Sequence, residues 1–408
     1  MRSNATQCSS DSQSDRVPMS VALICGSLES GCDGVGDYSR ELAAELIRQG
    51  YDSCLISLAD QGAKGVVEEK QGAGDVSVRA LRVPVSAPWP QRVAAARRFM
   101  DRAGVSQISF QFVPYTYSPK GVVRTAVPFL VRLAEGRKVH MMFHELWIGN
   151  SMNSSFKHRL VGALQRHYVL GLVRKLVPAA VHTSNPVYVA FLARYGISAR
   201  ILPLFGSVPV QADAGVEQAF DLFRQHGVDL SLPDRRAYWV GGVFGSITSE
   251  WTPEPFFSEL AQVAAREKKM IVIAGIGRLG AKGDAKWSEM VRTYADRFRF
   301  ALLGRLPVET ISPLFRVLDF GISTTAWRVF GKSSASASMT DHGLPVIVIR
   351  DDWRPRPELD VAFNYPPVIR RFEPGTINDF AGFLANKREP LSTRPEVAKR
   401  FIDSLASS

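Results

Sequence analysis

The sequence has few cysteines, no long apolar run and no segment that resembles a secretion signal. Its four cysteines, Cys8, Cys25, Cys32 and Cys54, form no CxxC pair, which argues against a structural zinc site and against a disulfide framework. We expect reduced thiols, with Cys25 and Cys54 buried in strands. No apolar run approaches the roughly 18–20 residues that a membrane-spanning helix needs.

The beginning of the chain lacks the basic start and the apolar stretch of a signal peptide. Residues 1–18 are polar and rich in serine, and we expect them to form a disordered leader. The composition, 46% hydrophobic and 22% charged, is typical of a globular protein, and 408 residues suit two domains of roughly 150–200 residues each. We therefore predict a two-domain protein in the cytoplasm.

Acidic residues are scarce in one long stretch of the chain. The net charge is +11, and no aspartate or glutamate occurs between Glu145 and Asp213. Such an excess of positive charge favours an anionic partner, which could be nucleic acid, anionic lipid or a phosphorylated substrate. The stretch carries seven basic residues: Lys157, Arg159, Arg166, Arg174, Lys175, Arg194 and Arg200.

The sequence does contain a regular alternation of strand and helix patterns. Residues 21–25 form a short apolar run that ends in a glycine-rich loop, a helical pattern starts at Asp37, and residues 53–57 have the pattern of the next strand. A strand, a glycine-rich turn, a helix and a second strand are the opening of a parallel, doubly wound sheet. The alternation continues as far as a strand at residues 200–203.

A second unit with the same alternation follows. The pattern breaks at residues 206–213, where we place a linker, and it resumes between residues 238 and 349. We therefore predict an α/β fold with two Rossmann-like, doubly wound parallel-sheet domains. The predicted parts are residues 1–18 (leader), 19–207 (N-terminal domain), 208–390 (C-terminal domain) and 391–408 (a terminal helix with apolar residues at helical spacing).

Ligands bind to open parallel sheets at the carboxyl ends of the strands. In the first half, this position holds a loop whose glycines allow close approach and whose following helix offers free amides to a phosphate or a sugar hydroxyl. After the strand at residues 138–143 it holds an imidazole, which can hydrogen-bond a sugar hydroxyl or a phosphate. The candidate residues are Gly34, Val35, Gly36 and Asp37 in the loop, and His144 and Glu145 after the strand.

In the second half of the sequence, two loops and the N-terminus of one helix are expected at the carboxyl ends of parallel strands. An arginine beside a glycine loop can clamp a diphosphate with its forked guanidinium, and a lysine with two hydroxyls at a helix N-terminus also suits a diphosphate. A P-loop is not indicated, because Ala326 stands where that motif requires a glycine. The candidate residues are Gly245, Ser246, Gly277, Arg278, Lys332, Ser333 and Ser334.

These segments together resemble the retaining GT-B glycosyltransferases of family four. The run from Gly34 to Leu42 resembles the first loop and helix of that family, and His144-Glu145 resembles its histidine at a strand end of the N-terminal domain. The later segments follow the pattern of its donor-binding domain in order: Phe244 to Ile247, Gly275 to Gly277, Gly304, and His342 to Ile347.

The resemblance implies two Rossmann-like domains that face a central cleft. It implies transfer of a sugar from a nucleotide-sugar donor to a glycan or lipid-linked acceptor, with retention at the anomeric carbon and without a metal or other cofactor. By this analogy, His144 contacts the donor sugar, with Glu145 beside it. Arg278 and Lys332 neutralise the leaving diphosphate, and Ser333 and Ser334 donate hydrogen bonds to it. Such enzymes act in the synthesis of cell-surface polysaccharides and glycolipids.

The sequence departs from this family at one important pair of positions. The family usually carries two glutamates eight positions apart, where this chain has Phe330 and Ser338. Two alternative functions therefore stay open. One is a non-catalytic, degenerate glycosyltransferase that binds a sugar nucleotide or a partner protein, and the other is a nucleotide-sugar epimerase with the same fold.

The basic stretch allows two interpretations of residues 155–175. One is an ordinary surface helix whose apolar face packs on the core. The other is a helix that lies on an anionic membrane and brings a peripheral enzyme to a lipid-linked acceptor. Nucleic acid fits less well, because no basic motif is interleaved with aromatic residues. The apolar residues near one helical face are Phe156, Leu160, Leu164, Tyr168 and Leu172.

Overall fold

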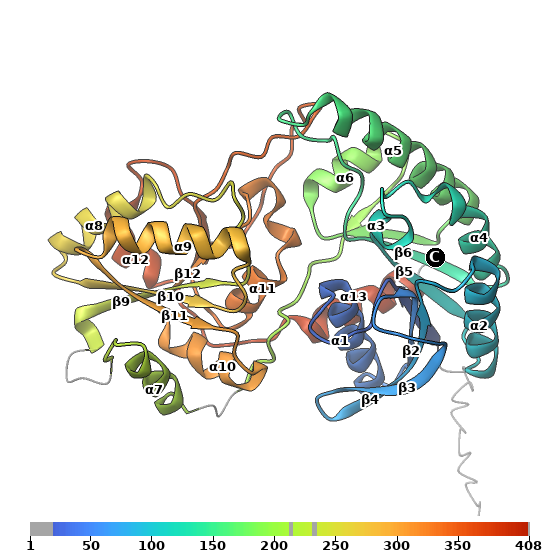
Figure 1. The fold of residues 1–408 in the computed structure, drawn as a ribbon, viewed down its shortest axis with the longest axis horizontal. Coiled ribbons are helices and arrows are strands. Elements are labelled where there is room, and N and C mark those ends of the chain that lie inside the picture. Colours follow the sequence, from blue (N-terminus) through green and yellow to red (C-terminus); the bar gives the residue numbers. More distant parts are fainter. Residues whose placement is uncertain (1–18, 212–214, 231–234, 407–408) are drawn as a thin grey trace, which may run out of the picture.

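The computed structural model describes residues 19–211, 215–230 and 235–406. The predicted leader, residues 1–18, lies outside the described residues, as do Asp213 of the predicted linker and the last two residues of the predicted terminal helix. The described chain forms two α/β lobes that lie side by side (Figure 1). Within the described ranges, no helix has both the length and the apolar character needed to cross a membrane.

The N-terminal lobe is built on a twisted sheet of eight strands in the order β3-β4-β2-β1-β5-β6-β7-β8. All neighbouring strands are parallel except β3, which pairs antiparallel with β4. The strands are β1 (Ser20–Cys25), β2 (Asp52–Asp60), β3 (Val67–Ala73), β4 (Val76–Pro84), β5 (Gln107–Phe112), β6 (Lys138–Phe143), β7 (Ala180–Thr183) and β8 (Arg200–Ile201).

Helices cover both faces of this sheet. Along β1, Ala22 and Ile24 pack into one apolar cluster and Val21 and Leu23 into another, so both faces are buried. This burial explains why β1 is apolar throughout and shows no alternation. The helices are α1 (Gly34–Arg48), α2 (Trp89–Arg102), α3 (Pro114–Tyr117), α4 (Val127–Ala134), α5 (Phe156–Leu176) and α6 (Pro186–Ala193), with a short 3-10 turn η1 (Val123–Thr125).

The C-terminal lobe repeats this architecture with six parallel strands in the order β11-β10-β9-β12-β13-β14. Its strands are β9 (Tyr238–Phe244), β10 (Met270–Ile276), β11 (Phe298–Gly304), β12 (Phe320–Ser323), β13 (Val346–Val348) and β14 (Ile369–Arg371). Its helices are α7 (Glu217–Gln225), α8 (Phe256–Arg266), α9 (Ala281–Tyr294), α10 (Val308–Val317), α11 (Ser334–Asp341) and α12 (Phe380–Leu384), with 3-10 turns η2 (Arg235–Ala237), η3 (Trp327–Lys332) and η4 (Ile377–Asp379).

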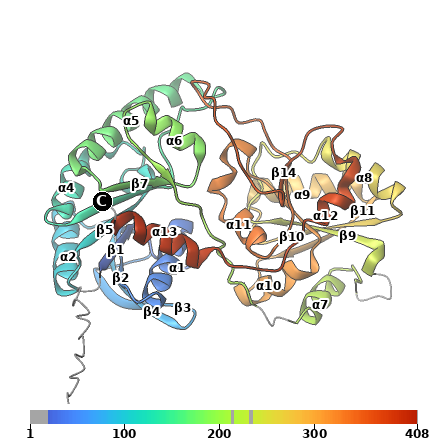
Figure 2. The same ribbon diagram turned by 180° about the vertical axis from the view of Figure 1, so that it is seen from behind.

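The last helix, α13 (Arg394–Ala406), returns to the N-terminal lobe. Figure 2 shows it beside α1, and Val397, Phe401 and Leu405 belong to the same apolar cluster as Leu42 and Leu46 of α1. The chain therefore passes between the lobes twice, once in each direction.

One buried carboxylate joins the two crossings. Asp341 at the end of α11 accepts hydrogen bonds from Gly206 N (3.0 Å) on the first crossing and from Thr393 Oγ1 (2.9 Å) on the second. On the first crossing, Val208 N also donates to Ser338 Oγ (3.3 Å). The start of the predicted linker is thus bound to α11.

A third connection is made by the long segment between β13 and β14, residues 350–368, which we call the strap. Met152 N donates to Arg354 O (3.0 Å), and Arg356 N donates to Asn150 O (2.7 Å). Together they form a short antiparallel bridge at Ser151 and Pro355. The strap therefore ties the C-terminal lobe to the loop just before α5.

Candidate functional site

The central contact of the candidate site joins the two lobes. Glu145 follows β6 in the N-terminal lobe, and Lys332 ends η3 in the C-terminal lobe. Lys332 Nζ lies 3.1 Å from Glu145 Oε1 and donates a second hydrogen bond to Tyr188 Oη on α6 (3.0 Å). The fold thus brings His144-Glu145 and Lys332, which are far apart in the sequence, to one place.

The surroundings of Lys332 keep it positively charged. Burial lowers the pKa of its ammonium group, but the Tyr188 hydroxyl and the Glu145 carboxylate outweigh burial and hold the pKa above its ordinary value. The side chain keeps 24% of its surface exposed. Lys332 is therefore a permanent cation with a small exposed surface at the cleft, as the binding of a diphosphate requires.

His144 lies beside this cation and is held neutral. Burial, and then the charge of Lys332, lower the pKa of its imidazole to about 3. Its Nε2 lies 2.8 Å from Gln111 Oε1 on β5, and its ring meets Tyr38 edge-on. A neutral imidazole can position a ligand by hydrogen bonding, but near neutral pH it has no proton to give as a general acid.

Gln111 begins a buried chain of hydrogen bonds that runs from His144 across the sheet. Its Nε2 donates to Ser109 Oγ (2.7 Å), which lies 2.7 Å from His140 Nδ1. His140 Nε2 lies 2.8 Å from His182 Nδ1. Because the Gln111 amide donates to Ser109, its carbonyl must accept from His144, so His144 carries its proton on Nε2, and no residue that the structure describes donates to its Nδ1.

The predicted glycine loop forms the wall of the cleft opposite Lys332. Asp33 caps α1 by accepting from Val35 N (2.9 Å), and Asp37 accepts from Gly31 N (3.1 Å) and from Arg40 Nη1 (2.6 Å). Because carboxylates already occupy these amides, the loop suits sugar hydroxyls better than a phosphate. Gly36 has a packing role, since an added Cβ would lie 2.2 Å from Ser27 O.

Two adjoining hollows open between this loop and the C-terminal lobe. One, of ≈ 320 Å³, is lined by Gly34, Val35, His144, Glu145, Lys332 and Ser334, among others. The other, of ≈ 240 Å³, shares Gly34, Tyr38 and Ser334 with the first and extends along α1 to Asp37 and Glu41. Six of the predicted residues thus line the first hollow, and Asp37 lines the second.

The remaining predicted donor-site residues form a second group. Gly245 and Gly277 both have positive φ and adjoin each other, since an added Cβ on Gly277 would lie 3.5 Å from Gly245 N. Ser246 O accepts from Thr324 Oγ1 (2.8 Å), which joins the loops after β9 and β12. Arg278 is exposed and forms no ion pair within the described residues. None of these four residues lines either hollow.

Ser333 and Ser334 have different positions at the start of α11. Ser333 Oγ accepts from Ser336 N (3.1 Å) and so caps the helix, and Ser333 lines neither of the two hollows. Ser334 lines both hollows and is half-buried. Ser334 is therefore the hydroxyl that faces a ligand beside Lys332.

The two positions that replace the expected glutamates lie outside both of these hollows. Phe330 is buried and packs against Tyr365 of the strap. Ser338 is fully buried, donates to Ser334 O (2.9 Å) and accepts from Val208 N. Neither side chain lines the two hollows, so neither substitutes for a carboxylate that binds the donor.

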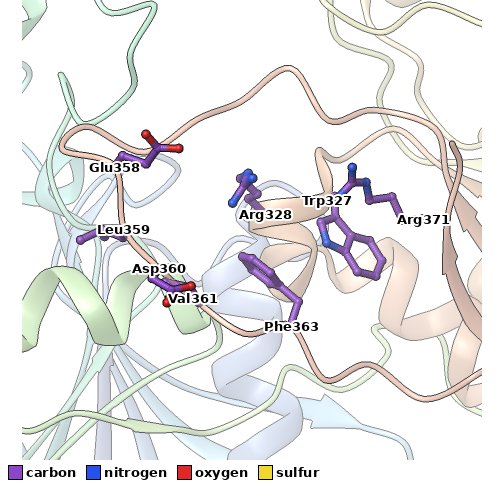
Figure 3. Close-up of a pocket in the computed structure, with 8 residues that line it drawn as sticks. All are labelled: Trp327, Arg328, Glu358, Leu359, Asp360, Val361, Phe363 and Arg371. Carbon is purple, nitrogen blue, oxygen red and sulfur yellow. The ribbon is translucent and has the colours of Figure 1, made fainter.

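A third hollow, of ≈ 470 Å³, lies under the strap. Figure 3 shows Arg328 between the strap residues Glu358 to Val361 on one side and Trp327 and Arg371 on the other. Asp351 lies close to three guanidinium groups: Arg354 Nη1 at 2.7 Å, Arg371 Nη2 at 3.4 Å and Arg328 Nε at 3.8 Å. This cluster anchors the strap to the end of the C-terminal sheet.

Sequence reasoning missed Tyr188 and Gln111. Tyr188 lies on an apolar helix, and only its contact with Lys332 from the other lobe distinguishes it from a core residue. Gln111 had a recognisable signal, because Ser109, Gln111 and His140 are polar residues inside strands that are otherwise buried and apolar. The two predicted thiols, Cys25 and Cys54, are buried in β1 and β2, which confirms that prediction.

In the part of the chain that the structure describes, no three His, Cys, Asp or Glu side chains gather as a metal site would require. The polar groups that line the two hollows include the ammonium group of Lys332, the neutral imidazole of His144, the guanidinium group of Arg40, hydroxyls and carboxylates. Such a set can bind an anion next to a polyhydroxyl ligand.

Comparison with known proteins establishes the fold. No protein-family model matches the sequence, and no curated protein resembles it significantly. Solved structures do match over nearly the whole chain. HepE from Anabaena in complex with UDP has a TM-score of 0.56 at 13% identity, covering 96% of this chain and 100% of that one. The catalytic domain of starch synthase IV from Arabidopsis thaliana, bound to ADP and acarbose, has a TM-score of 0.53 at 12% identity, covering 96% of each chain.

A protein described as a putative UDP-N-acetylglucosamine 2-epimerase from Listeria monocytogenes is similar to the same degree, with a TM-score of 0.54 at 10% identity and 96% coverage of each chain. Identities this low establish the GT-B fold and leave the chemistry to be argued from the site. The predicted fold class, with two Rossmann-like lobes around a cleft, is confirmed.

Proposed function

We propose that this protein is a glycosyltransferase that transfers a sugar from a nucleotide-sugar donor to a glycan or lipid-linked acceptor. The observation that carries the proposal is the position of Lys332. It places a permanent cation from the C-terminal lobe directly against His144 and Glu145 of the N-terminal lobe, at the carboxyl ends of both sheets. The fold and the GT-B neighbours with bound UDP or ADP support a nucleotide ligand.

Each group in the cleft has a role in this proposal. Lys332 and Ser334 bind the diphosphate and stabilise the charge that grows on it as the sugar departs. His144, neutral and free at Nδ1, accepts a hydrogen bond from a hydroxyl of the donor sugar. The α1 loop, with its two carboxylates, holds hydroxyls of the sugar or the acceptor. No metal is required, because the ammonium group supplies the positive charge.

Glu145 has a double role in the proposal. Glu145 neutralises Lys332 through their ion pair, and a bound diphosphate takes its place. Once released, the carboxylate lies beside the reacting sugar, where it can orient the acceptor hydroxyl or take its proton. We propose transfer with retention, in the synthesis of cell-surface polysaccharide or glycolipid.

A non-catalytic role is the second candidate, and one observation favours it. The two positions that carry glutamates in the resembled family, Phe330 and Ser338, are buried and lie outside the hollows. A protein without these carboxylates could bind a sugar nucleotide without turnover. An epimerase remains a third candidate, because a similar structure carries that description.

Two measurements test the proposal and separate the candidates. The first is the melting temperature of the protein with a panel of nucleoside diphosphates and their sugars, since a ligand of the native state raises it. A selective shift that Lys332→Ala abolishes supports the cleft as a donor site, and the absence of any shift contradicts it. The second is product analysis with the bound donor. Acceptor-dependent transfer supports the glycosyltransferase, release of an epimer supports the epimerase, and binding without turnover across an acceptor panel supports the non-catalytic protein.

A further inference from the structure

The first half of α5 turns large apolar side chains toward solvent. Phe156 is 73% exposed, Leu160 54% and Leu164 53%, and Met152, in the loop just before the helix, is 50% exposed. Phe156, Leu160 and Leu164 follow one another at intervals of four residues, so they form a continuous row along the helix surface. We call them the apolar row of α5.

Helix geometry explains why this row faces solvent although its continuation faces the core. Four residues advance an α-helix by slightly more than one turn, so a row at this spacing rotates by about 40° at each step. The row therefore starts in solvent at Phe156, passes the half-buried Tyr168 and ends in the core at Leu172. The interpretation that this apolar face packs on the core is wrong for its first three members.

The core-facing side of α5 is a different set of residues. Val169 and Val173 belong to the apolar core of the lobe. Gly162 lies so close to the loop before the helix that an added Cβ would be 1.9 Å from Ile148 O. Gln165 is fully buried, and its Nε2 donates to Lys120 O (2.7 Å). The packing of α5 on the lobe is therefore complete without the apolar row.

Exposed basic side chains lie at the two ends of α5. Lys157 lies in the first turn, next to Phe156, and Arg174 and Lys175 lie in the last turn, 10 and 11 residues beyond Leu164. Among the described residues none of the three forms an ion pair, and the chain contains no acidic residue from position 146 to 212. The outward side of α5 thus combines uncompensated positive charge with exposed apolar side chains.

We propose that the outward side of α5 binds the surface of an anionic lipid bilayer. Apolar side chains flanked by lysine and arginine match the interface of such a membrane, where the former enter the acyl boundary and the latter contact the headgroups. A second copy of the chain fits this surface less well, because a two-fold contact would bring together two identical surfaces that both carry excess positive charge.

The position of α5 gives this binding a consequence for the cleft. The helix follows the loop that pairs with the strap, and both figures of the fold show it at the outer rim of the N-terminal lobe (Figures 1 and 2). A membrane on α5 would lie next to the point where the lobes meet. The acceptor is then a lipid-linked one, an assignment that rests on the proposed transferase function, whereas membrane binding itself does not.

The test is co-sedimentation of the full-length protein with vesicles, in the absence of nucleotide and acceptor. Phosphatidylcholine vesicles are compared with vesicles that also contain phosphatidylglycerol. We expect binding only to the anionic vesicles, and weaker binding at high salt. A variant with Phe156, Leu160 and Leu164 all replaced by serine should lose binding by about tenfold or more. A second variant, with Lys157, Arg174 and Lys175 replaced by glutamine, should lose the preference for anionic lipid.

The matched control replaces exposed leucines elsewhere, Leu302→Ser with Leu391→Ser, which are 42% and 75% exposed. This control should bind like the wild type, and circular dichroism confirms that each variant is folded. The proposal is overturned if the wild type does not bind anionic vesicles, or if the serine variant binds as well as the control. It is also overturned if the wild type is a dimer in solution that the serine variant converts to a monomer. Because no donor is present, none of these outcomes depends on the transferase proposal.

Discussion

Lys332 Nζ lies 3.1 Å from Glu145 Oε1, although the two residues belong to different lobes and are separated by 187 positions in the chain. This ion pair occupies the place where the proposed diphosphate would bind. Glu145 therefore holds the ammonium group of Lys332 in position and neutralises its charge. Binding exchanges one negative partner of Lys332 for another.

The Lys332→Ala substitution should weaken binding of the nucleoside diphosphate that stabilises the wild type. The expected loss is about 1–3 kcal/mol, the usual magnitude for a charge-assisted hydrogen bond. Isothermal titration calorimetry measures the change. Arg278→Ala is the matched control, because Arg278 is an exposed cation outside the hollows. Equal losses in both variants would mean that Arg278 contributes as much to diphosphate binding as Lys332 does, as the family resemblance implies.

The Glu145→Gln substitution should act in the opposite direction on the same ligand. The amide keeps the shape of the side chain but removes the negative charge that competes for Lys332, so diphosphate affinity should rise. The same calorimetry measures it, and the rise should disappear in the presence of Lys332→Ala, since the two residues act on one contact. A fall in affinity would show that Glu145 helps to hold the ligand.

The buried histidines should make the protein sensitive to mild acid. Burial lowers the pKa of His144 to about 3 and that of His182 to about 4, and burial together with its histidine neighbours lowers the pKa of His140 well below the ordinary 6.5. Below pH 6.5 the unfolded chain binds protons at these positions and the folded chain does not. The free energy of unfolding should therefore be constant above pH 6.5 and fall as the pH drops, by about 1.4 kcal/mol per pH unit for each histidine.

Urea unfolding between pH 7 and pH 5 measures this slope. The His182→Asn substitution provides the comparison, because the Asn carbonyl can accept from His140 in place of Nδ1 but does not titrate. The free energy of unfolding of this variant should fall less steeply with decreasing pH than that of the wild type, by about 1.4 kcal/mol per pH unit, the contribution of one histidine. An unchanged slope would show that His182 is already protonated in the folded protein.

Two glycines of the α1 loop should respond differently to the same substitution. Gly36→Ala places a Cβ 2.2 Å from Ser27 O and should reduce the free energy of unfolding by about 1–3 kcal/mol. Gly34→Ala has no heavy atom within 4 Å of its new Cβ and should leave stability nearly unchanged. Urea unfolding compares the two variants. Equal destabilisation would mean that the loop needs glycine for its backbone conformation rather than for close packing.

The Asp351→Ala substitution should release the strap. It removes the carboxylate that lies near the guanidinium groups of Arg328, Arg354 and Arg371 and leaves these charges to repel one another. Hydrogen exchange at the Met152 and Arg356 amides, which pair the strap with the N-terminal lobe, should then become faster. Asp352→Ala is the control, because Asp352 is 44% exposed and pairs with Arg350 alone among the described residues. Equal acceleration in both variants would contradict the anchoring role of Asp351.

Sequence patterns predicted secondary structure best for strands whose residues are nearly all buried. The strand at residues 138–143 was predicted with the bounds that the structure shows, because it is a buried run between clear turns. The exposed strand β3 has no apolar period and was missed, since its stability comes from pairing with β4. The helix predicted to start at Asp37 starts at Gly34, because the Asp33 cap outweighs the low helix propensity of glycine.

The sequence predicted which residues of each lobe lie near the candidate site, but it did not predict the contacts between the two lobes. Strand ends placed His144 and Lys332 at the correct edges of their sheets, because the parallel topology fixes those edges. Strand topology fixes positions within one lobe, but no pattern in the sequence fixes how one lobe is oriented relative to the other. Tyr188 was missed for this reason, and Arg278 was grouped with Lys332 although its loop lies outside the hollows.

The two crossings between the lobes, joined at Asp341, restrict how the cleft can change its width. The strap attaches the lobes at a second place, Ser151 and Pro355, so the motion left to the lobes is rotation about the line through these two attachments, and a single angle describes the opening of the cleft. A ligand that touches both lobes has only this angle to fix. Ligand binding then loses the conformational entropy of this one angle only. More of the free energy gained from the contacts of a small ligand is therefore available as affinity.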